Sequence, residues 1–277
     1  MSGTPEQSTL TSGTPSTDPS PISKDDVIFF DDVTKIFSGG DGGDVAAVEG
    51  LSFSVSVGEM VALVGQTGCG KSTAFNLLLG LFAPTSGVIN VQGRDPYRDF
   101  ESFKGKVAVV FQEDRLLPWR TAQDNVALGL QYQAVSRSER TEIARDWLAR
   151  LGLKGREGAY PYELSGGMRQ RVSIARCFAL NPDVILCDES FSALDELTAD
   201  QLREEFVKLV REEGKTGVFI THSIEEAITM GERVLVFRAP GHVAAEIAIP
   251  ASLDAAGIGR YRNLVRDAMG GNLNSTS

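Results

Sequence analysis

The stretch that decides the fold is "LVGQTGCGKSTAFNLLLG", residues 63–80, in which a glycine-rich turn joins an apolar run to a helical pattern. The spacing Gly65-x-x-x-x-Gly70-Lys71-Ser72 fits a phosphate-binding loop. Glycines let backbone N–H groups close around phosphate oxygens, and the helix N-terminus favours the negative charge. We expect Lys71 to neutralise the β- and γ-phosphates and Ser72 to ligate Mg²⁺. The predicted ligand is a nucleoside triphosphate, which leaves a kinase, a GTPase, a motor and a pump component open.

The composition narrows the class of partner and the compartment. The chain has 277 residues, 42% hydrophobic content and a formal net charge of −10, enough for one large domain or one domain with a subdomain. An acidic chain gains nothing from counterion release on nucleic acid, so no nucleic-acid partner is expected. Three scattered cysteines without CxxC spacing fit a reducing cytosol, and two histidines make a structural zinc site unlikely.

No apolar run approaches the roughly 18–20 residues that span a bilayer. The first residues have neither a basic start nor a continuous apolar core, so we do not expect them to be a signal peptide. If the protein serves a membrane process, separate subunits must cross the membrane.

Strand and helix signals alternate outward from the phosphate loop. Residues 51–57 alternate apolar and serine positions, as a half-exposed strand does, and "MVALV", "KVAVVF", "DVILC", "TGVFI" and "RVLVF" are short apolar runs typical of buried strands. Ser136 with Glu139 and Ser223 with Glu226 predict two capping boxes. The alternation predicts an α/β fold with a largely parallel central sheet, interrupted by a mostly helical region from about residue 113 to 180.

Two carboxylates end the apolar run in "DVILCDES", residues 183–190. Asp188 at the strand tip is placed to hold the Mg²⁺ water shell, and Glu189 to polarise a water for attack on the γ-phosphate. A strand that ends in Asp-Glu is weak evidence alone, since a solvated strand end looks the same. Paired with an upstream phosphate loop in one sheet, it indicates a hydrolytic site.

A second side-chain-poor helix start, "LSGGMRQR" at residues 164–171, narrows the class. A serine and two glycines before an amphipathic helix form a second anion site. One nucleotide does not need two such sites in one subunit. The economical interpretation is a head-to-tail pair of subunits, each presenting this helix to the other's ATP; the alternative is a plain serine-capped helix.

The motifs "GQTGCGKST", "LSGGMRQR", "VILCDE", "SALD" and "THSIEEA" resemble, in order and spacing, those of ATP-binding cassette (ABC) transporter ATPases over about residues 27–240. The resemblance implies a P-loop fold with a small antiparallel β subdomain and a helical subdomain. It also implies a dimer that closes over two ATP molecules and opens after hydrolysis, driving membrane subunits between two access states.

The resemblance assigns roles by matching position. Gln112 would contact Mg²⁺ and sense the membrane subunits, Asp195 would cross the dimer interface, and His222 would hydrogen-bond the γ-phosphate. The catalytic set is then Glu189, His222, Gln112 and Lys71, with Ser72, Gln112 and Asp188 at the metal. The nucleotide-binding set is Phe37, Gly65, Gln66, Thr67, Gly68, Cys69, Gly70, Lys71, Ser72, Thr73, Ser165, Gly166, Gly167 and Asp195, of which Ser165 and Gly167 would touch the partner's γ-phosphate.

Some positions have rival interpretations. Phe37 occupies the place of the family's adenine-stacking aromatic but is equally interpretable as a core residue. Gln112 and His222 could be an ordinary strand-end residue and a structural histidine. Ser190 stands where the family usually has proline, which is expected to loosen the local backbone and leave the base in place.

The segment "FQEDRLLPWRTAQDNVALGL", residues 111–130, with "SGGMRQR" after it, resembles importer ATPases for nitrate, aliphatic sulfonates and taurine. Its apolar part has two interpretations: it docks onto a short helix of a membrane partner, or it packs the subdomain's own core. This part is "LLPW", formed by Leu116, Leu117, Pro118 and Trp119. The resemblance implies membrane permease subunits, an extracytoplasmic solute-binding protein, and a peripheral place on the cytoplasmic face of the membrane. It does not specify the substrate.

Two other functions compete with the transport ATPase. One is a soluble ABC-type ATPase in assembly or regulation, and the other is a nucleic-acid ATPase, disfavoured by a single cassette and the negative charge. We expect a Ser/Thr/Pro-rich disordered tail at 1–24, a nucleotide-binding core at 25–112 and 181–240, a helical subdomain at 113–180 and a C-terminal strand, helix and flexible tail at 241–277.

Overall fold

The computed structural model describes residues 26–39 and 43–270. The tail predicted at 1–24 and the end of the chain after residue 270 lie outside the described residues. Two β-sheets and seven α-helices make up the described part of the chain, together with three short 3₁₀ helices at Phe100–Phe103, Gly129–Gln133 and Pro161–Glu163.

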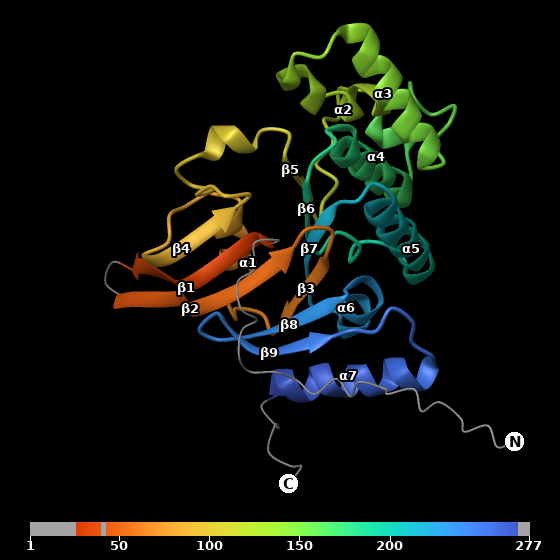
Figure 1. The fold of residues 1–277 in the computed structure, drawn as a ribbon. Coiled ribbons are helices and arrows are strands. Elements are labelled where there is room, and N and C mark those ends of the chain that lie inside the picture. The colour runs from red at the N-terminus through yellow and green to blue at the C-terminus, as the bar shows by residue number, and fades with distance from the viewer. Residues whose placement is uncertain (1–25, 40–42, 271–277) are drawn as a thin grey trace, which may run out of the picture.

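The central sheet has six strands in the order β5-β6-β7-β3-β8-β9 (Figure 1). The strands are β3 (Met60–Gly65), β5 (Val107–Val110), β6 (Val184–Asp188), β7 (Thr216–Thr221), β8 (Arg233–Arg238) and β9 (His242–Ala248). All neighbours are parallel except β9, which runs antiparallel to β8. The five apolar runs recognised in the sequence are the five parallel strands, so the prediction of a largely parallel sheet is confirmed.

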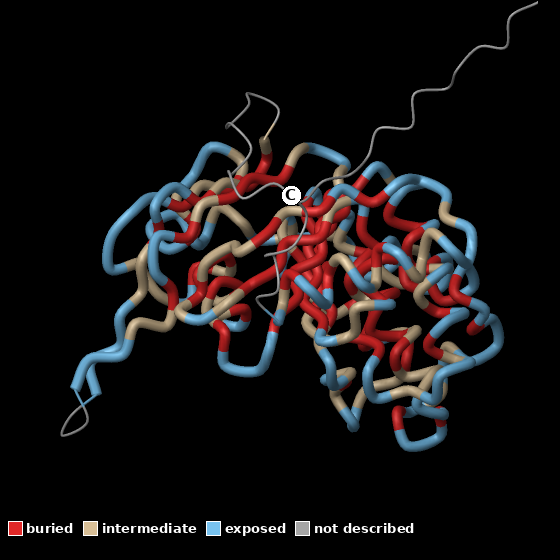
Figure 2. Tube along the Cα trace, turned by 90° about the horizontal axis from the view of Figure 1, so that it is seen from below, coloured by how far each residue is buried: buried red, intermediate tan, exposed pale blue. Residues whose placement is uncertain are grey.

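A second, antiparallel sheet has the order β2-β1-β4, formed by β1 (Asp26–Gly39), β2 (Gly43–Ser56) and β4 (Ser86–Val91). It confirms the predicted antiparallel β subdomain. Only the end of β2 gave a strand signal in the sequence. The hairpin of β1 and β2 extends from the body, and its far end is exposed (Figure 2).

Some helices lie beside the central sheet, and others form a group beyond one end of it (Figure 1). They are α1 (Lys71–Leu78), α2 (Ala122–Val126), α3 (Arg137–Arg150), α4 (Gly166–Ala179), α5 (Glu196–Glu212), α6 (Ile224–Met230) and α7 (Ala255–Gly270). Helices α2, α3 and α4 lie together in the region expected to be helical. Within the described ranges, none of the helices combines the length and the apolar character needed to cross a membrane.

Strand β3 is buried on both faces, and its alternate residues enter different cores. Met60, Ala62 and Val64 belong to the core that helices α2 to α7 cover. Val61 and Leu63 belong to the core shared with α1 and the antiparallel sheet. Because β3, β5, β6 and β7 are parallel, their carboxyl ends meet at one edge of the sheet, where the loops that carry the motifs begin.

Candidate functional site

The phosphate loop turns the carboxyl end of β3 into the N-terminus of α1. Lys71, the first residue of the helix, is 7% exposed, and its ammonium donates to the carbonyl oxygens of Gly65 (2.7 Å) and Gln66 (3.1 Å). The loop is thereby tied around the lysine. A helix N-terminus has backbone N–H groups without partners inside the helix, so the loop presents an anion site with a fixed cation beside it.

Two glycines of the loop have no room for a side chain. Gly70 caps α1 with a φ of 100°, and a Cβ there would lie 2.5 Å from the carbonyl oxygen of Ala47. At Gly65 a Cβ would lie 2.5 Å from the carbonyl oxygen of Phe237 and 2.6 Å from the sulfur of Cys69. The glycine spacing in the sequence therefore has a steric cause: neighbouring strands press on the loop.

A hollow of about 520 Å³ lies against this loop. Its lining includes residues from both sides of the sheet edge: Ala47, Thr67, Gly68, Gly70, Lys71, Ser72, Thr73, Glu189 and His222. The structure thus brings most of the predicted phosphate loop together with the predicted base and the predicted γ-phosphate ligand. Cys69 is buried behind the loop, where its sulfur lies 3.7 Å from the Lys71 ammonium.

Glu189 and His222 face each other across two neighbouring parallel strands. The Glu189 carboxylate lies 3.3 Å from Nδ1 of His222, whose side chain is 62% exposed. Glu189 has a φ of 46°, rare for a residue with a side chain, and its N–H donates to the carbonyl of Ile220 on β7. This backbone conformation places the carboxylate beside the histidine at the mouth of the hollow.

Asp188 precedes it as the last residue of β6. Burial, and then the neighbouring Glu189 carboxylate, raises the pKa of Asp188 above its usual value, while Arg115 opposes the shift. A carboxylate that is charged at a site with too few counter-charges is suited to a cation. Ser72 lines the hollow, whereas Asp188 lies outside its lining, next to Glu189. A hydroxyl and a carboxylate are among the oxygen donors that Mg²⁺ prefers.

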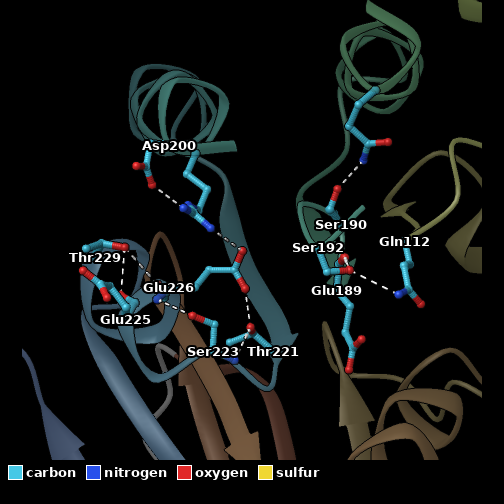
Figure 3. A network of polar contacts seen from close by, with 12 residues as sticks. Gln112, Glu189, Ser190, Ser192, Asp200, Thr221, Ser223, Glu225, Glu226 and Thr229 are labelled. Atoms are coloured by element: carbon cyan, nitrogen blue, oxygen red, sulfur yellow. Dashed lines mark hydrogen bonds and ion pairs between the residues drawn. The ribbon is translucent and has the colours of Figure 1, made fainter. Parts of the chain in front are cut away.

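Ser190 corrects the expectation of a loosened backbone. Its side chain is buried, and its hydroxyl donates to the carbonyl of Val110 at 2.7 Å. Its own carbonyl accepts from the buried amide of Gln170 at 2.7 Å, a contact drawn in Figure 3. The segment after the base is therefore tied to β5 and to helix α4, because a serine hydroxyl donates a hydrogen bond that proline cannot.

Gln112 lies outside the lining of the hollow, exposed at the end of β5. Its amide donates to the hydroxyl of Ser192 at 3.1 Å, and that hydroxyl donates to the carbonyl of Glu189 at 2.9 Å (Figure 3). The glutamine predicted to sense the membrane subunits is thus one hydroxyl away from the backbone of the predicted base. The role of Ser192 was not recognised from the sequence, since its contact with Gln112 joins distant segments.

Ser165, Gly166 and Gly167 lie at the start of α4 and do not line this hollow. The Ser165 hydroxyl caps the helix by accepting from the N–H of Met168 at 3.3 Å. A Cβ on Gly167 would lie 2.8 Å from the methyl of Thr198 on α5. The start of α4 therefore abuts the start of α5.

Asp195 caps α5 by accepting from the N–H of Thr198 at 3.1 Å, and this backbone hydrogen bond is the main cause that lowers the pKa of Asp195. We call α4, which begins in "LSGG", the signature helix. Its start and "SALD" thus share one surface, which is separate from the phosphate loop of the same chain.

Phe37 also lies outside the lining of the hollow. Its ring packs edge-on against Phe82 at 5.5 Å between centroids, and the ammonium of Lys35 lies 5.1 Å from its centroid. The side chain is 41% exposed, so Phe37 is not a core residue, and its stacking on adenine stays a prediction.

Part of the "LLPW" segment packs in the core of the subdomain, and part of it is exposed and free to dock onto a partner. Leu116 is buried in the core, whereas Pro118 and Trp119 are exposed, Trp119 by 71%. The fully buried Asn125 holds the turn between them: its oxygen accepts from the N–H of Leu117 at 2.7 Å, and its amide donates to three carbonyls, those of Leu117, Arg120 and Thr121. Asn125 was missed from the sequence, where it looks like an ordinary polar residue of a short helix.

The chain is similar to proteins of one family. A family model described as "ABC transporter" matches residues 48–192. The taurine import ATP-binding protein TauB of Rhizobium johnstonii is 45% identical over 216 residues, 78% of this chain and 81% of that protein. TauB of Escherichia coli K12 is 44% identical over 204 residues, 73% of this chain and 78% of that protein.

Among solved structures, a dimeric ATP-binding cassette in a post-hydrolysis state, bound to ADP and phosphate, superposes with a TM-score of 0.71. It is 33% identical, and the match covers 81% of this chain and 100% of that one.

Proposed function

The chain belongs to the ABC transporter family and is an ATPase subunit of an importer, and from that premise we propose that it powers the uptake of a small anionic solute of the nitrate, aliphatic sulfonate or taurine type. The observation that supports ATP hydrolysis is that Lys71, Glu189 and His222 line the same hollow. The solute class is supported by the similarity to the taurine import proteins.

The residues of the hollow divide the hydrolysis between them. Lys71 and the loop N–H groups bind the phosphates, and His222 donates a hydrogen bond to the γ-phosphate. Glu189 accepts a proton from the attacking water, whose oxygen bonds to the γ-phosphorus. The bond between the γ-phosphorus and the bridging oxygen of the β-phosphate breaks, and the products are ADP and phosphate. Such a base contributes about 10²–10⁴ in rate. Ser72, Asp188 and Gln112 would hold Mg²⁺, which would supply positive charge to the phosphates.

The second anion site of this chain would bind the ATP that the partner cassette holds in its phosphate loop. Ser165, Gly166 and Gly167 at the start of α4, with Asp195 beside them, are far in sequence from the phosphate loop and do not line its hollow. A head-to-tail dimer, of two copies or of this chain with a second cassette, brings each signature helix to the other subunit's ATP. The dimeric state of the similar solved cassette supports this arrangement.

The membrane partner is a permease that docks near Trp119, so the chain works at the cytoplasmic face of the membrane together with an extracytoplasmic solute-binding protein. The exposed indole next to the Gln112 segment supports this contact. Aromatic side chains that are exposed in the free subunit commonly anchor interfaces.

The test is purification of the tagged chain from its native cells in mild detergent, with mass spectrometry and an ATPase assay of the same sample. A polytopic membrane protein at near one-to-one ratio, together with ATP hydrolysis, is the expected result. A soluble dimer that hydrolyses ATP without a membrane partner would favour an assembly or regulatory ATPase instead.

A further inference from the structure

A buried carboxylate that the ATP chemistry does not use lies just beyond His222. Glu226, on the first turn of α6, is only 6% exposed. A charged group in the interior is unfavourable unless it is paired and hydrogen-bonded. Glu226 is both, and its partners come from two different elements that flank the site.

The first set of partners brackets His222 in the chain. The Thr221 hydroxyl donates to the Glu226 carboxylate and accepts from the N–H of Ser223 at 2.9 Å. The Ser223 hydroxyl accepts from the N–H of Glu226 at 3.2 Å (Figure 3). The residues before and after His222 are therefore both held by Glu226, directly or through one hydroxyl. The backbone from which the imidazole projects is fixed at two points.

The second partner is Arg203 on α5, whose guanidinium lies 3.3 Å from the other Glu226 oxygen and also bonds Asp200 (Figure 3). Burial opposes the charged guanidinium, but the hydrogen bonds to Asp200 and Glu226 outweigh it and raise the pKa of Arg203. Helix α5 begins at its cap Asp195, in contact with the signature glycines through Thr198.

We infer that Glu226 is a positioning residue for ATP hydrolysis: with Thr221 and Arg203 it fixes the loop of His222 to helix α5. This inference rests on the proposed role of His222 at the γ-phosphate. It connects the loop of His222, through Glu226 and Arg203, to the helix that starts at the proposed dimer interface. The 3.3 Å contact between His222 and Glu189 depends on the same loop.

The test uses two substitutions at Thr221 that separate the hydroxyl from the packing. Thr221→Val keeps the shape of a buried strand residue and removes the hydroxyl, whereas Thr221→Ser keeps the hydroxyl. For Thr221→Val we expect kcat for ATP to fall about tenfold, the effect of one net hydrogen bond, with KM changed less than twofold. Thr221→Ser should keep kcat within about threefold of wild type. Both proteins should bind ATP as the wild type does.

Glu226→Gln tests the ion pair, and Glu225→Gln is its control. Glu225 is the neighbouring carboxylate on the same helix, pairs with Arg262 at the surface and does not contact the His222 loop. Glu226→Gln should lower kcat at least tenfold at unchanged KM, measured on protein shown to be folded by its melting curve, and Glu225→Gln should match the wild type.

Equal rates for Thr221→Val and Thr221→Ser, or wild-type kcat in Glu226→Gln, would overturn the inference. A wild-type protein that does not hydrolyse ATP would overturn the proposed function itself, which the controls keep separate.

Discussion

Lys71 is desolvated before any nucleotide arrives, because the loop carbonyls of Gly65 and Gln66 hold its ammonium at the floor of the hollow. Lys71→Ala removes both the cation for the phosphates and the tie that shapes the loop. A charged hydrogen bond is worth about 1.5–3 kcal/mol, so the Kd for ATP should rise about 10- to 100-fold, measured by titration calorimetry. Lys208→Ala, at an exposed site on α5, is the control. Unchanged nucleotide affinity in Lys71→Ala would remove Lys71 from the phosphate site.

Asp188 is expected to reduce the stability of the nucleotide-free protein. Its pKa is raised in the folded state, so its contribution to stability is present at low pH and is lost as the pH rises through the folded-state pKa. At pH 7 the charged carboxylate, crowded by Glu189, is therefore unfavourable. Asp188→Asn should raise Tm by about 1–2 °C, the effect of roughly 0.5 kcal/mol after allowance for solvent screening.

That gain in Tm should shrink as the pH falls and the wild-type carboxyl takes up its proton. ATPase activity in the presence of Mg²⁺ should be lost at every pH. A lower Tm at pH 7 would mean that Asp188 stabilises the free protein and would contradict the assignment of its raised pKa to burial and to Glu189.

Single residues divide clearly into those the sequence could identify and those it could not. Short spacing predicted the phosphate loop, a strand end predicted Glu189, and the family resemblance predicted His222; the structure brings Glu189, His222 and most of the loop to one hollow. Ser190 was misjudged because its hydrogen bonds reach Val110 and Gln170, whose positions relative to it exist only in the fold.

At the scale of elements, the turn that presents Trp119 is rigid because one buried amide satisfies four backbone groups. Asn125→Ala would remove the partner of the Leu117 N–H and of the Arg120 carbonyl, at about 1–3 kcal/mol for each unsatisfied group. The other two carbonyls still accept from backbone N–H groups. We expect the free energy of unfolding to fall by about 2–3 kcal/mol, measured by urea denaturation. A change below 0.5 kcal/mol would show that water or rearrangement replaces the amide.

Trp119→Ala separates docking from folding. The indole is 71% exposed, so the free energy of unfolding should change by less than about 0.5 kcal/mol. The yield of membrane permease in the detergent purification should fall at least tenfold, since aromatic anchors dominate interface energies. Tyr132→Ala is the control, because Tyr132 is an aromatic residue of the same subdomain and is 81% exposed. Unchanged permease recovery with Trp119→Ala would show that the indole is not the anchor.

The helix caps show why element-level prediction was only partly right. Ser136 and Ser223 do cap α3 and α6, accepting from the N–H three residues later. The reciprocal bond expected from Glu226 to Ser223 does not form, because the carboxylate bonds Thr221 and Arg203 instead. A buried partner on another helix competes successfully with the local one, and residue spacing alone does not contain that competition. The strands β1 and β4 were missed for a related reason, since the sheet that pairs them is assembled from distant segments.

For the whole molecule, the separation of the two anion sites predicts an ATP-dependent change in mass. Glu189→Gln should keep ATP affinity but hydrolyse ATP at least 100-fold more slowly, so bound ATP persists. The chain has a mass of 29.8 kDa, and light scattering should give about twice this value for Glu189→Gln with ATP and Mg²⁺ and the monomer value without nucleotide. The two bound ATP molecules then hold the two cassettes together.

A charge at the signature helix tests the head-to-tail geometry within that dimer. Aspartate caps helices as well as serine does, so Ser165→Asp should leave α4 folded while adding a negative charge where the partner's γ-phosphate would bind. In the Glu189→Gln background, Ser165→Asp should therefore abolish the ATP-induced dimer. The matched control is Ser136→Asp, the same substitution at the cap of α3, which should leave the dimer intact. If Ser165→Asp still dimerises with ATP, the signature helix does not contact the partner's nucleotide, and the two anion sites must serve separate ligands.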